Sequence, residues 1–187
     1  MTILSHSDDL SVAPAVEPVS VADARRNSDV DDSYRDVDFS RWITEARKQV
    51  EHDSRLSLVN QTRIRKLDAF PSESYITLRA PLVSVSSISY IDTGGDSQTW
   101  SSAEYEVDTV RSCVHLLAHT YSYPTTRVTP NAVTITYISG HGATAATVPE
   151  AAKAAILLLC RFRHDEPGMT PEGYQDLINQ LKGGFYP

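Results

Sequence analysis

The chain has 187 residues and a formal net charge of −7 at pH 7, from 17 Lys and Arg against 24 Asp and Glu. This length suits one domain or a small domain with an insertion, and the negative balance argues against a phosphate-binding surface as the main function. The two cysteines, Cys113 and Cys160, are too few for a disulfide framework and indicate free thiols in a cytoplasm.

The first 57 residues predict an arm followed by two helices. Residues 1–18 (MTILSHSDDLSVAPAVEP) are polar and contain proline, so we expect an extended arm without its own core. They have neither the basic start nor the long apolar run of a signal peptide or membrane anchor. Ser20 is a good N-cap for a short helix over residues 20–27. Apolar residues at helical spacing then predict an amphipathic helix over residues 37–52.

Residues 58–139 change from helical to alternating periodicity, which predicts a meander of about six or seven short strands. A slip in the alternation at Ser86-Ser87 indicates a β-bulge. Residues 92–96 (DTGGD) have the glycines of a hairpin turn. The expected strands are residues 58–70, 75–78, 83–91, 98–100, 105–108, 114–117 and 133–139.

Residues 148–163 are apolar on nearly every side of a helix that we predict over residues 149–164. We expect the rest of the chain to be organised around this helix. The apolar run is too short to span a bilayer, which needs about 20 residues. We therefore expect this helix to pack on both sides, against its own domain and against a second domain or a neighbouring subunit. A last amphipathic helix is predicted over residues 171–182, and Gly183-Gly184 ends it, leaving an apolar tail of Phe185-Tyr186-Pro187.

Together these patterns predict an α+β fold, in which a small helical bundle carries an inserted antiparallel β module. The expected division is an extended N-terminal arm (1–18), a helical bundle (19–57 plus 140–182), a β-rich insertion (58–139) and a C-terminal tail (183–187).

Groups that would support catalysis or metal binding are sparse. His115 and His119 are four residues apart, but in a strand this spacing places them about 13 Å apart, too far to share a metal. Residues 140–142 (GHG) lack the lysine of a phosphate-binding loop and are better read as a turn. Cys160 lies among leucines, as a structural thiol does. We expect no enzyme, no catalytic residue, no cofactor and no metal.

Two clusters of charged residues can each be interpreted as a binding site or as an ordinary structural feature. Arg63, Arg65 and Lys66 could form a strip for nucleic acid, but a solvated sheet face or a salt-bridged interface suits the acidic chain better. Asp29, Asp31 and Asp32 lack the glycine and terminal glutamate of a calcium loop and are read as a solvated linker.

Eight short segments follow one another along the chain in a characteristic order: residues 19–24 (VSVADA), 39–50, 61–71, 79–85 (RAPLVSV), 90–92, 130–137 (PNAVTITY) with Gly140, 148–150 (VPE) and 154–159 (AAILLL). This ordered series resembles the head–tail connector, or adaptor, proteins of tailed double-stranded DNA phages, in the branch with a β-rich insertion. The resemblance covers residues 19–181 and leaves out the arm and the tail. The sequence departs from the family mainly at Arg161-Phe162-Arg163-His164, where the family has an aromatic-rich helix end.

This resemblance implies a structural virion protein, assembled in the host cytoplasm, at the head–tail interface. A ring of about twelve identical subunits would prolong the channel of the portal protein, receive the tail or its stopper, and let DNA pass without sequence-specific binding. The interface residues we expect are Leu157, Leu158, Arg161, Phe185, Tyr186 and Pro187. Two other classes stay open: another ring-forming virion protein, such as a stopper or tail terminator, and a small ligand-binding or enzymatic domain.

Overall fold

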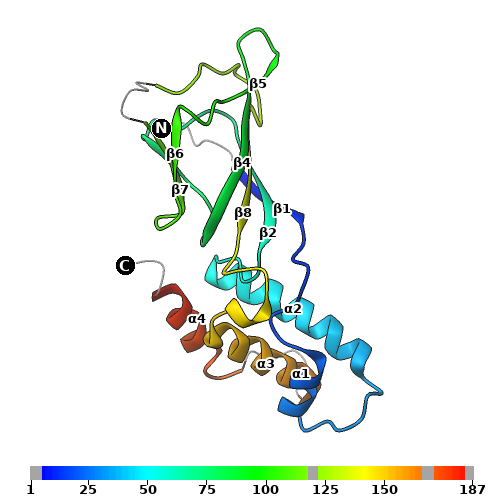
Figure 1. The fold of residues 1–187 in the computed structure, drawn as a ribbon. Coiled ribbons are helices and arrows are strands. Elements are labelled where there is room, and N and C mark those ends of the chain that lie inside the picture. Colours follow the sequence, from blue (N-terminus) through cyan, green and yellow to red (C-terminus); the bar gives the residue numbers. More distant parts are fainter. Residues whose placement is uncertain (1–5, 118–121, 166–170, 184–187) are drawn as a thin grey trace. The chain divides into compact units, whose positions relative to one another are not determined.

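The structure is a computed structural model that describes residues 6–117, 122–165 and 171–183. The chain divides into two compact units. One unit contains Met1–Ala13 and Asn60–Gly140, and the other contains Pro14–Val59 and His141–Pro187. The α-helices belong to the second unit and the antiparallel strands to the first (Figure 1). The expected α+β class is therefore confirmed.

The helical unit contains all four expected helices, with bounds that differ by one to three residues. The first begins after its predicted cap, because the Ser20 hydroxyl accepts a hydrogen bond from the Asp23 amide at 3.0 Å. Within the described residues, no helix has the length and apolar content needed to cross a membrane. The elements are α1 (Val21–Asn27), α2 (Asp36–Ser54), a 3₁₀ turn (Ala145–Thr147), α3 (Glu150–Asp165) and α4 (Tyr174–Gly183).

Helix α3, like α2, packs against each of the other three helices of the unit (Figure 1). Small side chains on one part of its surface, Ala152 and Ala155, are completely buried and allow neighbouring helices to approach closely. Much of the apolar surface that suggested a second partner is therefore covered by this unit's own helices. The buried residues of the four helices are mostly apolar: Ala24, Phe39, Ile43, Ala46, Val50, Ala152, Ala155, Ile156, Leu159, Cys160, Tyr174, Ile178 and Leu181.

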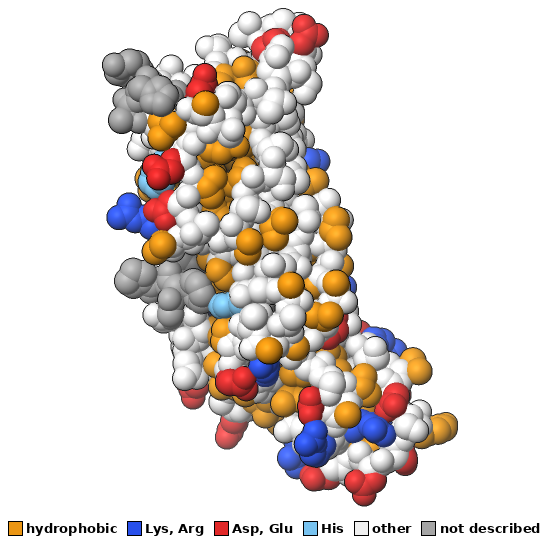
Figure 2. Space-filling model, viewed as in Figure 1, with side chains coloured by type: hydrophobic (Ala, Val, Ile, Leu, Met, Phe, Trp, Pro, Cys, Tyr) orange, Lys and Arg blue, Asp and Glu red, His pale blue; other side chains and the backbone are white. Residues whose placement is uncertain are grey.

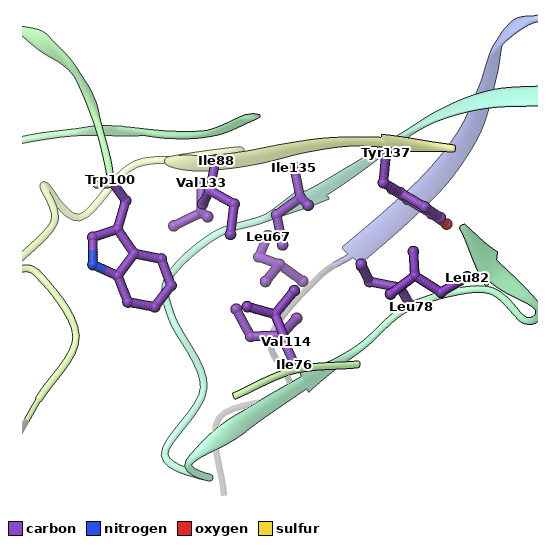
Figure 3. Close-up of a cluster of buried hydrophobic side chains, with 10 residues drawn as sticks. All are labelled: Leu67, Ile76, Leu78, Leu82, Ile88, Trp100, Val114, Val133, Ile135 and Tyr137. Carbon is purple, nitrogen blue, oxygen red and sulfur yellow. The ribbon is translucent and has the colours of Figure 1, made fainter. Parts of the chain in front are cut away.

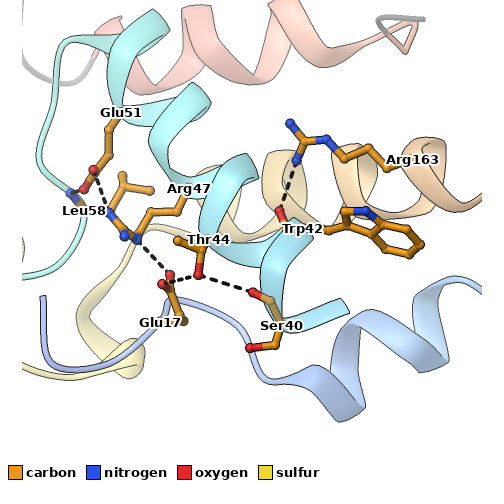
Figure 4. Close-up of polar contacts among 8 residues, drawn as sticks. All are labelled: Glu17, Ser40, Trp42, Thr44, Arg47, Glu51, Leu58 and Arg163. Atoms are coloured by element: carbon orange, nitrogen blue, oxygen red, sulfur yellow. Dashed lines mark hydrogen bonds and ion pairs between the residues drawn. The ribbon is translucent and has the colours of Figure 1, made fainter. Parts of the chain in front are cut away.

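A buried cation holds α2 to the chain segments on either side of it (Figure 4). The Arg47 side chain is only 3% exposed, and its guanidinium contacts Glu17 at 2.7 Å and Glu51 at 3.0 Å. Glu51 also accepts a hydrogen bond from the Leu58 amide at 2.9 Å, and the Thr44 hydroxyl donates to Glu17 at 2.9 Å. One arginine thus joins the segment before α1, the middle of α2 and the segment after α2.

Replacing this cation tests how much the network contributes. We expect Arg47→Met to lower the free energy of unfolding by about 3–5 kcal/mol, because it leaves the buried Glu51 carboxylate without its cation and removes the cation that holds Glu17. Lys48→Met, the same change at the exposed neighbouring position, should alter stability by less than about 0.5 kcal/mol. Urea denaturation followed by circular dichroism measures both. Equal unfolding curves for the two variants would contradict the assignment.

The β unit contains two antiparallel sheets. The larger has the strand order β1-β2-β8-β4-β5 and the smaller has the order β3-β7-β6. The bulge expected near Ser86-Ser87 is present as a register shift between Val85 and Ser87 in the pairing of β4 with β8. The strands are β1 (His6–Val12), β2 (Gln61–Leu67), β3 (Tyr75–Thr77), β4 (Leu82–Ile91), β5 (Ser97–Thr99), β6 (Tyr105–Asp108), β7 (Cys113–Leu116) and β8 (Val133–Ser139).

Two features of this topology correct the sequence-based expectation. The strands do not form a meander, because β8 lies between β2 and β4 and β3 belongs to the other sheet. Residues 1–18 are also more than an arm, because His6–Val12 pairs with β2 as an edge strand. Strands pair when their apolar side chains can be buried on the same face of a sheet, and strands that follow one another along the chain do not have to pair.

The core of the β unit lies between the two sheets. Val133 and Ile135 of β8 point toward Ile76 of β3 and Val114 of β7, and Tyr137 lies farther along β8 on the same face of the sheet (Figure 3). These five side chains are at most 3% exposed. The burial of β8 alternates strictly along the strand, as expected for a central strand with one face in the core. The complete cluster is Leu67, Ile76, Leu78, Leu82, Ile88, Trp100, Val114, Val133, Ile135 and Tyr137.

The edge strand β1 is fixed by one carboxylate. Asp8 Oδ1 accepts hydrogen bonds from Arg63 Nε at 3.0 Å and from the Tyr137 hydroxyl at 2.7 Å. Burial, together with the charge of Asp8, raises the pKa of Tyr137 well above its usual range. The Arg63 guanidinium also donates to the Asp8 carbonyl oxygen at 2.7 Å. Asp8 therefore helps to specify the register of a strand whose two large apolar side chains, Leu10 and Val12, are exposed.

Removing this carboxylate should loosen β1. We expect Asp8→Ala to lower the free energy of unfolding by about 1–3 kcal/mol, because a buried guanidinium and a buried hydroxyl lose their acceptor. Asp9→Ala is the matched control, since Asp9 is exposed and its carboxylate accepts a hydrogen bond from the Ser7 hydroxyl two residues away. Urea unfolding, with hydrogen exchange of the β2 amides as a local measure, separates the variants. Unchanged protection of β2 in Asp8→Ala would rule out this role.

Candidate subunit interface

Three of the expected interface residues, Leu157, Leu158 and Arg161, lie in the middle of α3 and toward its end. Leu157 and Leu158 are each partly exposed, whereas Leu159 is buried. The Arg161 side chain is 49% exposed. The chain's own helices therefore leave a strip of α3 open to solvent, and this strip contains both leucines.

Leu157 lies on a groove formed by α1, the segment before it, and α3. The groove has a volume of about 680 Å³. Its lining combines apolar groups, from Val19 and Leu157, with charged groups, from Asp23, Arg26 and Lys153. Basic and acidic side chains are intermixed around α1 on the face seen in Figure 2. An apolar strip bordered by charges of both signs has the composition of a protein–protein contact.

Arg161 joins α3 to the end of α1. Its guanidinium donates to the Asn27 carbonyl oxygen at 3.4 Å and lies 3.6 Å from Asp29 and 3.4 Å from Asp165. The Asn27 side chain in turn donates to the Leu157 carbonyl oxygen at 3.2 Å. Such exposed ion pairs contribute little to stability, about 0–1 kcal/mol. They place charged groups of α1, α3 and the segment after α1 beside the partly exposed leucines.

The end of α3, where the sequence departs from the phage connector pattern, has a packing role. Arg163 donates to the Trp42 carbonyl oxygen at 3.0 Å (Figure 4) and to the Gln49 side chain at 3.2 Å. The His164 ring stacks on Phe39 with ring centroids 6.0 Å apart. This end of α3 therefore packs on α2. Phe185, Tyr186 and Pro187 lie outside the described residues.

The other charged and reactive groups are mostly engaged in structural contacts. Arg63 is bound to Asp8, and Arg65 donates to the Thr77 carbonyl oxygen at 2.6 Å. These contacts match the salt-bridged reading of the basic cluster better than a nucleic-acid strip. Burial raises the pKa of the Cys160 thiol to about 12, which is unsuited to a nucleophile.

The sequence analysis did not predict one group of possible metal ligands. Asp108, Cys113 and His115 bring their ligand atoms within 4.8 Å of one another. The available signal was the Cys-x-His spacing on one strand, which places both side chains on the same face. His119, with which His115 was compared, lies outside the described residues. Cys113 and Asp108 both approach the same His115 nitrogen, Nε2, whereas a nucleophile–base–acid relay uses both ring nitrogens.

Comparison with protein-family models finds no match, and comparison with curated proteins finds none either. Solved structures do match. A chain in the neck of an empty gene transfer agent (GTA) particle, computed with C6 symmetry, has a TM-score of 0.77 and 19% identity, over 94% of this chain and 95% of that chain.

Two further matches have nearly the same extent. A chain in the virion of the native GTA particle has a TM-score of 0.73 and 18% identity, over 94% of each chain. A chain in the neck of the native particle, computed with C12 symmetry, has a TM-score of 0.70 and 20% identity, over 93% of this chain and 94% of that chain. At these identities the likeness concerns the fold, which this protein shares with chains of a particle neck over nearly its whole length.

Proposed function

We propose that this protein is a structural virion subunit of the head–tail neck, a connector or adaptor that forms a ring below the portal and joins head to tail. The observation that carries this proposal is the fold shared over 94% of the chain with a chain of a GTA neck. The resemblance of the ordered sequence segments to phage connectors supports the same function independently of the fold.

A ring requires each subunit to present two different surfaces that fit each other around a closed rotation. The partly exposed strip of Leu157 and Leu158, with Arg161 beside it, supplies one such surface. The matching GTA necks were computed with C6 and C12 symmetry, which supports a ring whose copy number fits one of these symmetries. A net charge of −7 suits a channel wall past which DNA slides without sticking.

A position between head and tail also implies which proteins the ring would contact. The portal protein would lie on one side and the tail, its stopper or its terminator on the other, after assembly in the host cytoplasm. A stopper or terminator is the second candidate, because a neck computed with C6 symmetry is compatible with a ring of six copies as well as with a ring of twelve. The copy number and the side on which the portal binds distinguish the two.

Size exclusion with light scattering, followed by negative-stain imaging of the purified chain with and without its portal, tests the ring. A closed ring of about twelve copies that binds the portal directly supports a connector. A ring of six that binds only to the assembled neck favours a stopper or terminator. A monomer in every mixture overturns both.

The α3 strip has its own test. We expect Leu157→Asp to weaken ring assembly strongly, because an unpaired charge buried at a contact costs several kcal/mol. Ala154→Asp introduces the same charge at an exposed position of the same helix and should leave assembly unchanged. Circular dichroism melting confirms that both variants fold. Rings of normal yield from Leu157→Asp would remove this strip from the interface.

The tail is expected to dock on another subunit, with the portal as the preferred partner. Two aromatic side chains after Gly183-Gly184 bury a large apolar area when they dock and should carry most of the local affinity. Deleting Phe185–Pro187 should preserve the melting temperature while reducing portal pull-down and particle yield. Wild-type pull-down and yield from the truncated chain would reject this docking.

A further inference from the structure

The turn that connects β6 to β7 brings three ligand-type side chains together. Asp108 at the end of β6 is paired with Cys113 at the start of β7, and His115 follows two residues later on the same strand. We propose that Asp108, Cys113 and His115 bind one Zn²⁺ ion, with water as the fourth ligand. This inference is independent of the proposed neck function, because all three ligands come from one subunit.

The distances suit a tetrahedral ion. Zinc bonds of about 2.0–2.3 Å place neighbouring ligand atoms about 3.3–3.8 Å apart. Cys113 Sγ lies 3.1 Å from His115 Nε2, and His115 Nε2 lies 3.8 Å from Asp108 Oδ2. All three ligand atoms lie within 4.8 Å of one another. The two pairs that involve His115 are thus within a few tenths of an ångström of the spacing that a tetrahedral ion requires, and the third pair, Cys113 with Asp108, must close from at most 4.8 Å.

The turn holds Asp108 in a suitable orientation. Its Oδ1 accepts hydrogen bonds from the Val110 and Arg111 amides, each at 2.9 Å. Oδ2 is then directed toward His115. Ser112 has a left-handed backbone conformation, with φ of 54°, and its carbonyl oxygen and hydroxyl accept hydrogen bonds from the Leu78 and Leu82 amides. The carboxylate and the following strand are thus positioned before any ion binds.

The donor set selects the metal. A thiolate with an imidazole favours Zn²⁺ over Mg²⁺ and Ca²⁺, which prefer oxygen ligands. On binding, Cys113 loses its proton to solvent and the sulfur forms the bond to zinc, while the neutral His115 ring contributes Nε2. Arg111 approaches Asp108 Oδ2 at 4.0 Å, but its side chain is 76% exposed and can turn into solvent. The expected consequence is a cross-link between β6 and β7.

Metal content and a spectroscopic probe test the site on the full chain. After stripping with a chelator and dialysis against Zn²⁺, the wild-type chain should retain one zinc per subunit by elemental analysis. Co²⁺ in place of zinc should give the near-ultraviolet charge-transfer band of a thiolate ligand. Absence of either signal in the wild-type chain overturns the proposal without requiring any variant.

Variants then identify the ligands. Loss of a residue that only orients a metal ligand costs about 10- to 100-fold in affinity, so Cys113→Ser and His115→Gln should weaken binding by at least about 100-fold. Asp108→Asn keeps the acceptor for the turn amides and should also bind more weakly. Cys160→Ala, the matched control at the other cysteine, should keep both zinc and the cobalt band. Wild-type affinity in Cys113→Ser, or loss of the band in Cys160→Ala, would contradict the assignment.

Discussion

The paired burial of Arg47 is the constraint on which the helical unit depends. A guanidinium in an apolar interior is tolerated only if its charge is compensated and its donors are satisfied. Glu17 and Glu51 supply that compensation from different parts of the chain. Because Glu51 also binds the Leu58 amide, the path of the chain after α2 is fixed by the same group. The His141 amide donates to the Leu58 carbonyl oxygen at 3.2 Å, so the returning chain is placed beside this segment before α3 begins.

This arrangement explains how a helical unit built from two distant segments can present a defined surface. Helix α3 reaches three other helices through small and medium side chains, and Tyr174 of α4 donates its hydroxyl to Asp53 of α2 at 2.7 Å. Five residues of α3 are buried in the unit: Ala152, Ala155, Ile156, Leu159 and Cys160. Leu157 and Leu158 are partly exposed, and Arg161 contacts the end of α1 beside them.

The β unit depends on long-range pairing in the same way. Strand β8 is central because both β2 and β4 pair with it, although about 70 residues separate β2 from β8 along the chain. The Asp8 carboxylate then adds β1 at the edge through Arg63 and Tyr137. The smaller sheet closes the core from the other side and contains the turn with Asp108, Cys113 and His115. A metal ion there would act within this sheet and leave the helical surface unchanged.

The sequence by itself determined the elements of this protein. Periodicity placed four helices and most strands within a few residues, Ser20 marked its cap, and the slip at Ser86-Ser87 marked its bulge. These features are local, since a cap or an alternating pattern depends on residues a few positions apart. Local patterns do not predict a strand when residues far apart in the sequence determine whether it forms. His6–Val12 has too little apolar character to predict a strand, and it becomes one because Asp8 meets Arg63 and Tyr137.

Only the tertiary structure decided which strands pair, how much of α3 is covered, and that Cys113 and His115 face Asp108. Leu157, Leu158 and Leu159 are the same residue type in succession, yet only Leu159 is buried, because exposure depends on where α1, α2 and α4 pack. The pairing of β6 with β7 likewise brings Asp108 beside two side chains that no spacing rule connects to it. Sequence patterns describe what each segment can form by itself, whereas contacts between segments depend on the burial and pairing of the whole chain.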